Sequence, residues 1–76
     1  MESIAGMDAR ETFAHNLRAE RKRLELSQEA LGFRCELNMS EISRLERSRR
    51  DPRLATIVKL AHALGIPPAK LLDGIQ

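Results

Sequence analysis

The chain has 76 residues, a net charge of +2, 42% hydrophobic residues and 3% aromatic residues. A chain this short has room for one domain with one small core, because folding buries only about 60% of its unfolded surface. A two-domain enzyme is therefore not expected. Phe13 and Phe33 are the only aromatic residues, so the core must be aliphatic, which favours packed helices and predicts an all-α fold.

Cysteine content and apolar patterning predict a cytoplasmic protein without a membrane partner. The single cysteine, Cys35, cannot form a disulfide within the chain. No apolar run approaches the roughly 18 residues that a membrane span requires, and the N-terminus lacks a secretory signal pattern. Residues 1–7 have no periodicity, and we expect a disordered or frayed lead-in to a single domain over residues 8–76.

The first helix is expected to begin at Asp8, which forms a capping-box pattern with Glu11. Residues at three- and four-residue spacing predict its buried stripe, namely Phe13, Ala14, Leu17, Arg21 and Leu24. Its charged side carries Arg10, Arg18, Lys22 and Arg23.

Residues 27–47 predict two short helices joined by a tight turn. Ser27 is a good N-cap for a helix that runs to about Cys35, and Asn38 is a good N-cap for the next helix. The turn between them is expected at Glu36 and Leu37.

Gly32 lies midway along the first of these helices. Glycine there costs about 0.5–1 kcal/mol in helix propensity, which indicates a close approach between the two helices. In the second helix Ile42 and Leu45 are predicted to face inward. The outward face then carries Met39, Ser40, Ser43, Arg44 and Arg47.

An arginine-rich connection leads to a fourth helix, in whose first turn we expect Pro52. A buried stripe is predicted at Leu54, Ile57, Val58, Ala61 and Leu64. Gly65 is expected to end this helix in a left-handed conformation. After Pro67–Pro68 a short helix is predicted from Ala69 to about Asp73, presenting Leu71 and Leu72.

Five arginines within ten residues form a local positive patch: Arg44, Arg47, Arg49, Arg50 and Arg53. Such a patch can contact phosphates, although a solvated charged face is the alternative interpretation. No enzymatic site is visible, because His15 and His62 have no acidic or cysteine residues at metal-ligand spacing. Cys35 is predicted to be a small buried residue. We therefore expect no catalytic activity, cofactor, metal or small-molecule ligand.

The segment 27–47 resembles the lambda-repressor-like (Cro/cI-type, XRE) helix-turn-helix family. The matching residues are Ser27, Gln28, Leu31, Gly32, Cys35, Leu37, Asn38, Ser40, Ile42, Ser43, Leu45 and Glu46. Outside the motif, residues 17–26 resemble the family's first helix, and Asp51-Pro52 with residues 54–65 resemble its fourth. The resemblance implies a five-helix domain with the helix-turn-helix at its second and third helices, and a function in binding double-stranded DNA.

The resemblance also implies residue roles. Gln28 would contact the phosphate backbone and brace a side chain of the recognition helix. Major-groove contacts would come from Asn38, Met39, Ser40, Ser43 and Arg44, with Arg44 as the preferred base contact because a guanidinium can bond both acceptors of guanine. Arg47, Arg49 and Arg50 would bind phosphates. Arg21 and Glu46 would form a structural ion pair.

The chain departs from the family pattern at Glu25, Glu36 and Ser48, where glycine is frequent. Glu36 either keeps a left-handed turn with strain of about 1 kcal/mol or shifts the turn geometry. Glu41 lies beside the predicted DNA-facing surface. It could accept a hydrogen bond from cytosine, pair with Arg44 or Arg47, or point to solvent.

The resulting hypothesis is a transcriptional regulator that binds an inverted-repeat operator as a homodimer. One helix-turn-helix unit contacts few base pairs, so two copies on half-sites about 10–11 base pairs apart are expected. The predicted dimer interface consists of apolar residues beyond the needs of a four-helix core, namely Ile66, Pro67, Leu71, Leu72 and Ile75; alternatively they cap the core. Restriction–modification controllers and small phage or plasmid repressors are the similar types, and RNA polymerase is a further candidate partner. An antitoxin-like module that binds a partner protein is the alternative.

Overall fold

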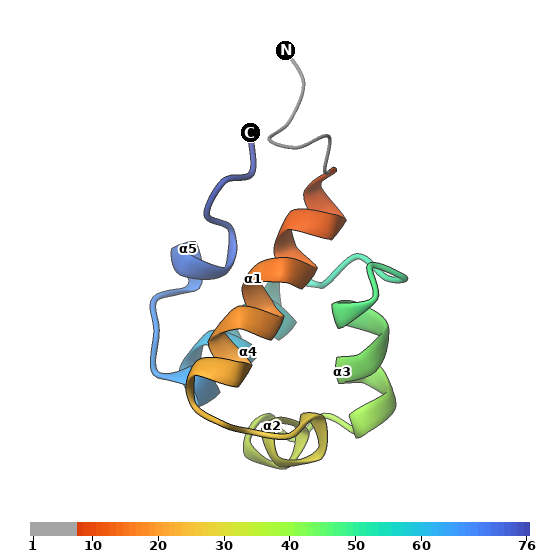
Figure 1. Ribbon diagram of the computed structural model, residues 1–76, viewed down its shortest axis with the longest axis vertical. Coiled ribbons are helices and arrows are strands. Elements are labelled where there is room, and N and C mark those ends of the chain that lie inside the picture. The colour runs from red at the N-terminus through yellow and green to blue at the C-terminus, as the bar shows by residue number, and fades with distance from the viewer. Residues whose placement is uncertain (1–7) are drawn as a thin grey trace.

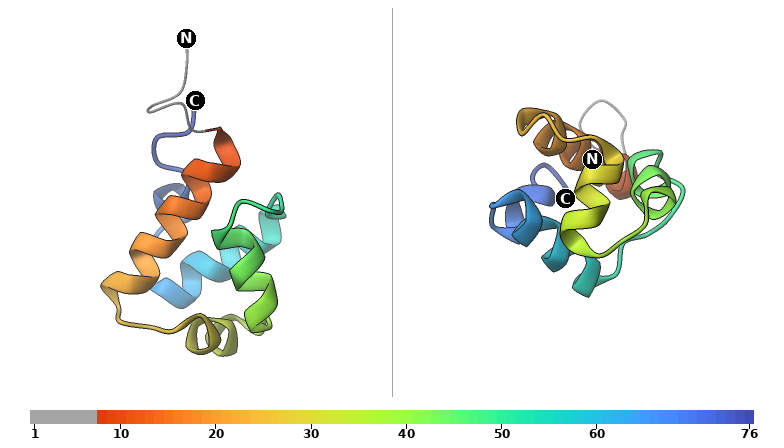
Figure 2. Two further views of the ribbon diagram at one scale, coloured as in Figure 1. Left: turned by 45° about the vertical axis from the view of Figure 1, so that its right-hand side comes forward. Right: turned by 90° about the horizontal axis from the view of Figure 1, so that it is seen from below.

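The computed structural model describes residues 8–76, and the predicted lead-in at residues 1–7 lies outside the described part. The five helices are α1 (Ala9–Arg23), α2 (Gln28–Cys35), α3 (Met39–Glu46), α4 (Leu54–Leu64) and α5 (Pro68–Leu71). α1 crosses in front of α4, with α3 on one side and α5 on the other (Figure 1). α2 closes the lower end and packs against α3 and α4 (Figure 2). Residues 8–76 contain no strand, so the predicted five-helix, all-α fold is confirmed.

Each helix contributes one large, fully buried aliphatic side chain to a single core. These side chains are Leu17, Leu31, Ile42, Leu60 and Leu71, in chain order from α1 to α5. Burying a leucine or isoleucine side chain contributes about 1.5–3 kcal/mol, so all five helices are held by the same apolar cluster. The core is mainly aliphatic, as inferred from the composition, and it also includes the aromatic ring of Phe13.

Side-chain caps fix where the first three helices begin. Asp8 and Glu11 form the predicted capping box, in which Asp8 accepts from the backbone N–H of Glu11 at 2.9 Å. The Ser27 hydroxyl oxygen accepts from the backbone N–H of Ala30 at 2.9 Å. Asn38 caps α3. Short polar side chains at these positions satisfy backbone donors that the first helical turn leaves unpaired.

The predicted stripe of α4 is wrong at two positions. Leu54 is 75% exposed and Val58 is 45% exposed, whereas Leu60 is fully buried. Residues 57, 60, 61 and 64 follow the helical period, so they form one face toward the core. Val58 is rotated by about 100° from Ile57, and this rotation turns it toward solvent.

Two predicted boundaries also differ. Helix α4 begins at Leu54 after an extended N-cap at Arg53, so Pro52 precedes the helix and is not in its first turn. Helix α5 covers Pro68–Leu71, not Ala69 to Asp73, because Pro68 occupies the first turn, where its missing N–H costs nothing.

Gly32 lies against the turn that separates α2 from α3. A Cβ atom at this position would stand 2.5 Å from the carbonyl oxygen of Leu37. The backbone N–H of Leu37 donates to the carbonyl of Gly32 at 2.9 Å, which draws the turn onto the helix. The close approach predicted at Gly32 is therefore present, and the residue met there is Leu37.

In the described part of the chain, residues 8–76, three residues other than glycine have left-handed backbone conformations: Glu25 (φ 58°), Glu36 (φ 61°) and Ser48 (φ 61°). These are the positions where the sequence departs from the family's glycines. Glu36 keeps the left-handed turn as the C-cap of α2, so the turn geometry has not shifted. Each such residue carries strain of about 1 kcal/mol. Gly65 ends α4 in the predicted left-handed conformation with φ 69°.

The C-terminal segment is attached to α1 by Asn16. Its side-chain amide Nδ2 donates to the carbonyl oxygens of Leu71 and Asp73, both at 2.9 Å. Leu71 is fully buried in the core of its own domain, so its assignment to a dimer interface is wrong. The helical turn of α5 directs Leu71 inward and leaves Leu72 40% exposed.

Candidate nucleic-acid interface

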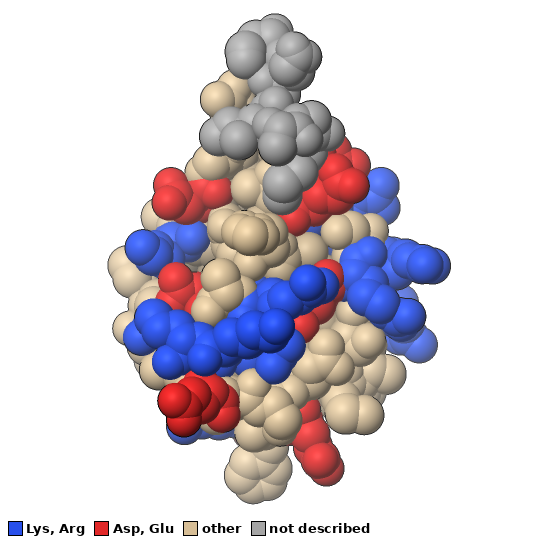
Figure 3. All heavy atoms as spheres, in the orientation of Figure 1, with Lys and Arg blue, Asp and Glu red and all other residues tan. Residues whose placement is uncertain are grey.

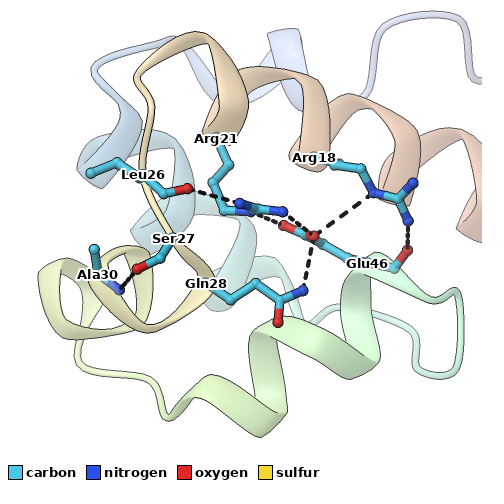
Figure 4. Close-up of polar contacts among 7 residues, drawn as sticks. All are labelled: Arg18, Arg21, Leu26, Ser27, Gln28, Ala30 and Glu46. Carbon is cyan, nitrogen blue, oxygen red and sulfur yellow. Dashed lines mark hydrogen bonds and ion pairs between the residues drawn. The ribbon is translucent and has the colours of Figure 1, made fainter.

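The carboxylate of Glu46, the last residue of α3, is bound by side chains from α1 and α2 (Figure 4). The Arg21 guanidinium makes two hydrogen bonds to it, from Nε to Oε2 at 2.6 Å and from Nη2 to Oε1 at 2.9 Å. The Glu46 side chain is 1% exposed. The hydrogen bonds with Glu46 raise the pKa of Arg21, against the lowering effect of burial, so the guanidinium stays protonated. The ion pair implied by the family resemblance is present.

Gln28 and Arg18 complete the contacts of Glu46. The side-chain amide of Gln28 donates from Nε2 to Oε1 at 3.1 Å, so the side chain that Gln28 braces is Glu46. Arg18 donates from Nη2 to the backbone carbonyl of Glu46 at 3.1 Å, and its Nε lies 3.9 Å from Oε1. Sequence reasoning missed Arg18 and placed it with the solvated charges. Its three-residue spacing from Arg21 was the available signal.

These contacts fix α3 relative to the rest of the domain. Arg21 also donates from Nη1 to the carbonyl of Leu26, just before α2 begins. One guanidinium thus connects α1, the α1–α2 loop and the C-terminal end of α3. Because buried charges are stable only when paired and hydrogen-bonded, this cluster allows a single orientation of α3.

The side of α3 opposite to Ile42 and Leu45 is open to solvent. Met39, Ser40, Arg44 and Arg47 are exposed, and Ser43 is half-buried. Arg49 and Arg50 follow in the loop to α4 and are exposed too. The structure thus brings the residues predicted to contact bases onto one helix face, with the predicted phosphate-binding arginines at its C-terminal end.

Basic side chains gather in two places on the face shown in Figure 3: over the C-terminal half of α1, and at the edge beside α3 and the following loop. Within residues 8–76, no side-chain hydrogen bond or ion pair occupies Arg44, Arg47, Arg49 or Arg50. Unpaired guanidinium groups beside a helix face are suited to bind phosphate and guanine.

Glu41 takes a structural role that was not among the three alternatives considered from the sequence. Its Oε1 accepts from the backbone N–H of Asn38 at 3.2 Å, and its own N–H donates to Asn38 Oδ1 at 2.8 Å. These bonds form a capping box that holds the carboxylate at the start of α3. The three-residue spacing of Asn38 and Glu41 in the sequence already indicates this capping box.

The remaining candidate groups show no catalytic arrangement among the described residues. Cys35 is buried, and its thiol donates to the carbonyl of Leu31 at 3.2 Å. Burial raises the pKa of this thiol, which agrees with the predicted small buried residue. His15 and His62 are exposed. Residues 8–76 contain no cluster of three His, Cys, Asp or Glu side chains that could hold a metal ion.

Comparison with known proteins identifies the family. Residues 17–71 match the helix-turn-helix family, which covers α1 from its midpoint through α5. The chain is 46% identical over 48 residues to control protein C.BamHI of Bacillus amyloliquefaciens, a match that covers 63% of this chain and 59% of that protein. The chain belongs to this helix-turn-helix family, and its fold is that of a DNA-binding regulator.

Two solved structures show the same fold. The restriction–modification controller protein C.AhdI from Aeromonas hydrophila is 40% identical, with a TM-score of 0.80, over 82% of this chain and 90% of that one. The P22 c2 repressor in complex with a synthetic operator is 35% identical, with a TM-score of 0.75, over 82% and 94% of the two chains. The antitoxin-like alternative is not favoured by these relatives. No helix within residues 8–76 is long and apolar enough to cross a membrane.

Proposed function

We propose that this protein is a transcriptional regulator that binds an inverted-repeat operator as a homodimer, of the kind found among restriction–modification controllers. The observation that carries the proposal is the solvent-exposed face of α3, held in one orientation by the contacts of Arg21, Gln28 and Arg18 with Glu46. A recognition helix must be rigidly placed, because base contacts form only within hydrogen-bonding distance.

Arg44 is the central base contact in this proposal. It lies in the last turn of α3 and is exposed, with no ion pair within residues 8–76. A guanidinium bonds both O6 and N7 of guanine, which discriminates against other bases by about 1–3 kcal/mol. Ser43, the residue before Arg44, adds a hydroxyl to the same face. Met39, one turn before Ser43, adds an apolar contact.

Phosphate contacts are assigned to both ends of the helix-turn-helix. Arg47, Arg49 and Arg50 lie at and after the end of α3, where they are exposed. Gln28 lies at the start of α2 and is half-buried, with its Nε2 on Glu46. The second hydrogen on Nε2 can donate to a phosphate, so Gln28 would couple backbone binding to the position of α3.

The dimer is assigned to the α5 end of the domain. Leu72 and Pro67 are exposed there, and Ile66 and Ile75 are half-buried. Leu54 and Val58 form a second exposed apolar pair, on α4. A pair of domains contacts twice as many base pairs, and it therefore reaches an affinity that one domain cannot.

The controller assignment is supported by the similarity of the chain to the control protein C.BamHI and the controller protein C.AhdI. Cooperative dimer binding would make occupancy of the operator depend steeply on the concentration of the protein. If it activates transcription, RNA polymerase is a further partner.

Footprinting on DNA upstream of the gene identifies the operator, and fluorescence anisotropy then measures binding to operator and scrambled duplexes. Arg44→Ala should lower affinity for the operator and relax preference at one base position. Arg49→Ala should weaken both duplexes alike and reduce the salt slope by about one. Arg23→Ala removes one exposed charge at the end of α1, outside the proposed DNA contacts and the proposed dimer interface, and serves as the matched control. Equal losses on both duplexes from Arg44→Ala would contradict its role as a base contact.

Sedimentation analysis tests the dimer. Leu72→Arg should shift the protein toward monomer, whereas Val58→Arg, an equal change at the exposed pair on α4, should leave the dimer intact. The opposite result would place the interface on α4, and a wild-type monomer bound singly to DNA would contradict the homodimer.

A further inference from the structure

The side-chain oxygen of Asn38 is fully occupied by contacts within the start of α3. Asn38 Oδ1 accepts from the backbone N–H of Glu41 at 2.8 Å and from the hydroxyl of Ser40 at 2.8 Å. A carbonyl oxygen has two lone pairs, and both are used. The amide Nδ2 of Asn38 has no partner among residues 8–76, and the residue is exposed.

The direction of both hydrogen bonds follows from the backbone. The N–H of Glu41 can only donate, so the Asn38 atom that faces it must be the oxygen and not the amide nitrogen. The Ser40 hydroxyl lies on the same oxygen and must donate its single hydrogen to it. The arrangement therefore determines which hydrogen-bonding groups the two side chains still present outward.

From this geometry we infer that Asn38 and Ser40 impose opposite hydrogen-bonding requirements on the operator: Asn38 contacts only an acceptor, through Nδ2, and Ser40 contacts only a donor, through its lone pairs. The inference rests on the proposed function, because it assumes that this end of α3 enters the major groove. It states which hydrogen-bonding groups Asn38 and Ser40 would recognise, which their amino-acid types alone do not determine.

The base edges that meet these requirements are limited. In the major groove the acceptors are purine N7, guanine O6 and thymine O4, and the donors are the amino groups of adenine and cytosine. Asparagine ordinarily recognises adenine by two bonds, accepting from the amino group and donating to N7. Asn38 cannot bind adenine in this way, because its oxygen already accepts hydrogen bonds from Glu41 and Ser40.

Functional-group deletion in the DNA tests the inference. Operator duplexes are made with one group removed at a time: 2-aminopurine removes guanine O6, 7-deazapurines remove N7, and 5-methyl-2-pyrimidinone removes thymine O4. Purine 2′-deoxyriboside and 2-pyrimidinone remove the amino groups of adenine and cytosine. Fluorescence anisotropy measures wild type, Ser40→Ala and Asn38→Asp on each duplex.

The variants are chosen to keep the helix cap. Aspartate is a good N-cap that retains the oxygen facing Glu41, and it replaces the outward donor of Asn38 by an acceptor. The aspartate charge repels the phosphates of every duplex alike, so its effect on affinity cancels when each analogue duplex is compared with the natural duplex. Ser40→Thr keeps the hydroxyl and is the control for Ser40→Ala.

We expect wild type and Ser40→Thr to lose about tenfold in affinity when one particular amino group is deleted, and Ser40→Ala to lose less than about twofold on the same duplex. Wild type should also lose about tenfold in affinity when one N7 or carbonyl acceptor is deleted. The affinity of Asn38→Asp should not change on deletion of that same acceptor.

The inference would be overturned if Asn38→Asp became insensitive to deletion of an amino group. It would also be overturned if Ser40→Ala became insensitive to deletion of an acceptor. Equal sensitivity of wild type and variants to every deletion would also overturn it. These outcomes differ from failure of the proposed function, in which wild type would bind the natural operator no better than a scrambled duplex.

Discussion

The Arg21 guanidinium on α1 and the Glu46 carboxylate at the end of α3 form a bidentate ion pair, with Nε–Oε2 at 2.6 Å and Nη2–Oε1 at 2.9 Å. The two residues are 25 positions apart in the chain. The pair is nearly inaccessible to solvent, and it joins the helix that would contact DNA to the longest helix of the domain.

Removal of Arg21 alone should destabilise the protein strongly. Arg21→Met leaves the Glu46 carboxylate buried with only Gln28 and Arg18 near it, and we expect a loss of about 3 kcal/mol in the free energy of unfolding. The double variant Arg21→Met/Glu46→Leu should recover much of this loss, because no unpaired charge remains buried. Urea unfolding followed by circular dichroism measures both.

The matched control is Arg23→Met, which breaks an ion pair with Glu20 in which Arg23 is half-exposed. Its effect should stay within about 0.5 kcal/mol. If Arg21→Met and Arg23→Met destabilised equally, the buried pair would have no special part in holding α3.

Gly32→Ala should destabilise the turn between α2 and α3. The added Cβ would meet the Leu37 carbonyl oxygen at 2.5 Å, and this backbone atom cannot move without displacing α3. We expect a loss of about 2–3 kcal/mol from overpacking, which exceeds alanine's gain of about 1 kcal/mol in helix propensity. Thermal unfolding measures the change.

Gly65→Ala provides the comparison for Gly32→Ala. No atom lies within 4 Å of a Cβ at Gly65, so its cost comes only from the left-handed backbone and should be about 1 kcal/mol. A larger loss at Gly65 than at Gly32 would show that steric contact with Leu37 is not the dominant effect.

Glu36→Gly should stabilise the domain. Glycine relieves the left-handed strain of about 1 kcal/mol at φ 61°, and a net gain of about 0.5 kcal/mol remains after the extra entropy of the unfolded chain. For a domain of this size this corresponds to a rise of about 2–4 °C in Tm. Glu36→Gln removes the charge but keeps the Cβ, so it should leave Tm nearly unchanged. An equal rise from both variants would attribute the effect to charge.

Cys35 should resist alkylation in the folded protein. Burial raises the pKa of its thiol, so at neutral pH the reactive thiolate is scarce as well as inaccessible. Iodoacetamide labelling followed by mass spectrometry should be slow in buffer and fast in denaturing urea. Rapid labelling of the folded protein would contradict the buried position.

The same shift in pKa has a defined effect on stability. The folded-state pKa is raised, so the contribution of Cys35 is complete below the ordinary thiol pKa and is lost as the pH rises through the raised value. Cys35→Ala should therefore flatten the fall in stability at alkaline pH. An unchanged alkaline profile in Cys35→Ala would show that other groups cause that fall.

Local patterns in the sequence determined much of the fold. Asp8, Ser27 and Asn38 begin their helices where the capping rules place them, and Gly65 ends α4, because caps depend on hydrogen bonds between near neighbours in the chain. The family resemblance supplied the Arg21–Glu46 pair, which no local pattern could reveal.

Only the tertiary structure decided which side chains face the core and which contacts hold the recognition helix. The assignments of Leu54, Val58 and Leu71 are wrong because apolar character alone does not show which face of a helix packs against the core. Arg18 and Gln28 meet Glu46 across helices that are separate in the chain. The direction of the hydrogen bonds of Asn38 and Ser40 also depends on the folded geometry, because the sequence does not show which atom each donor faces.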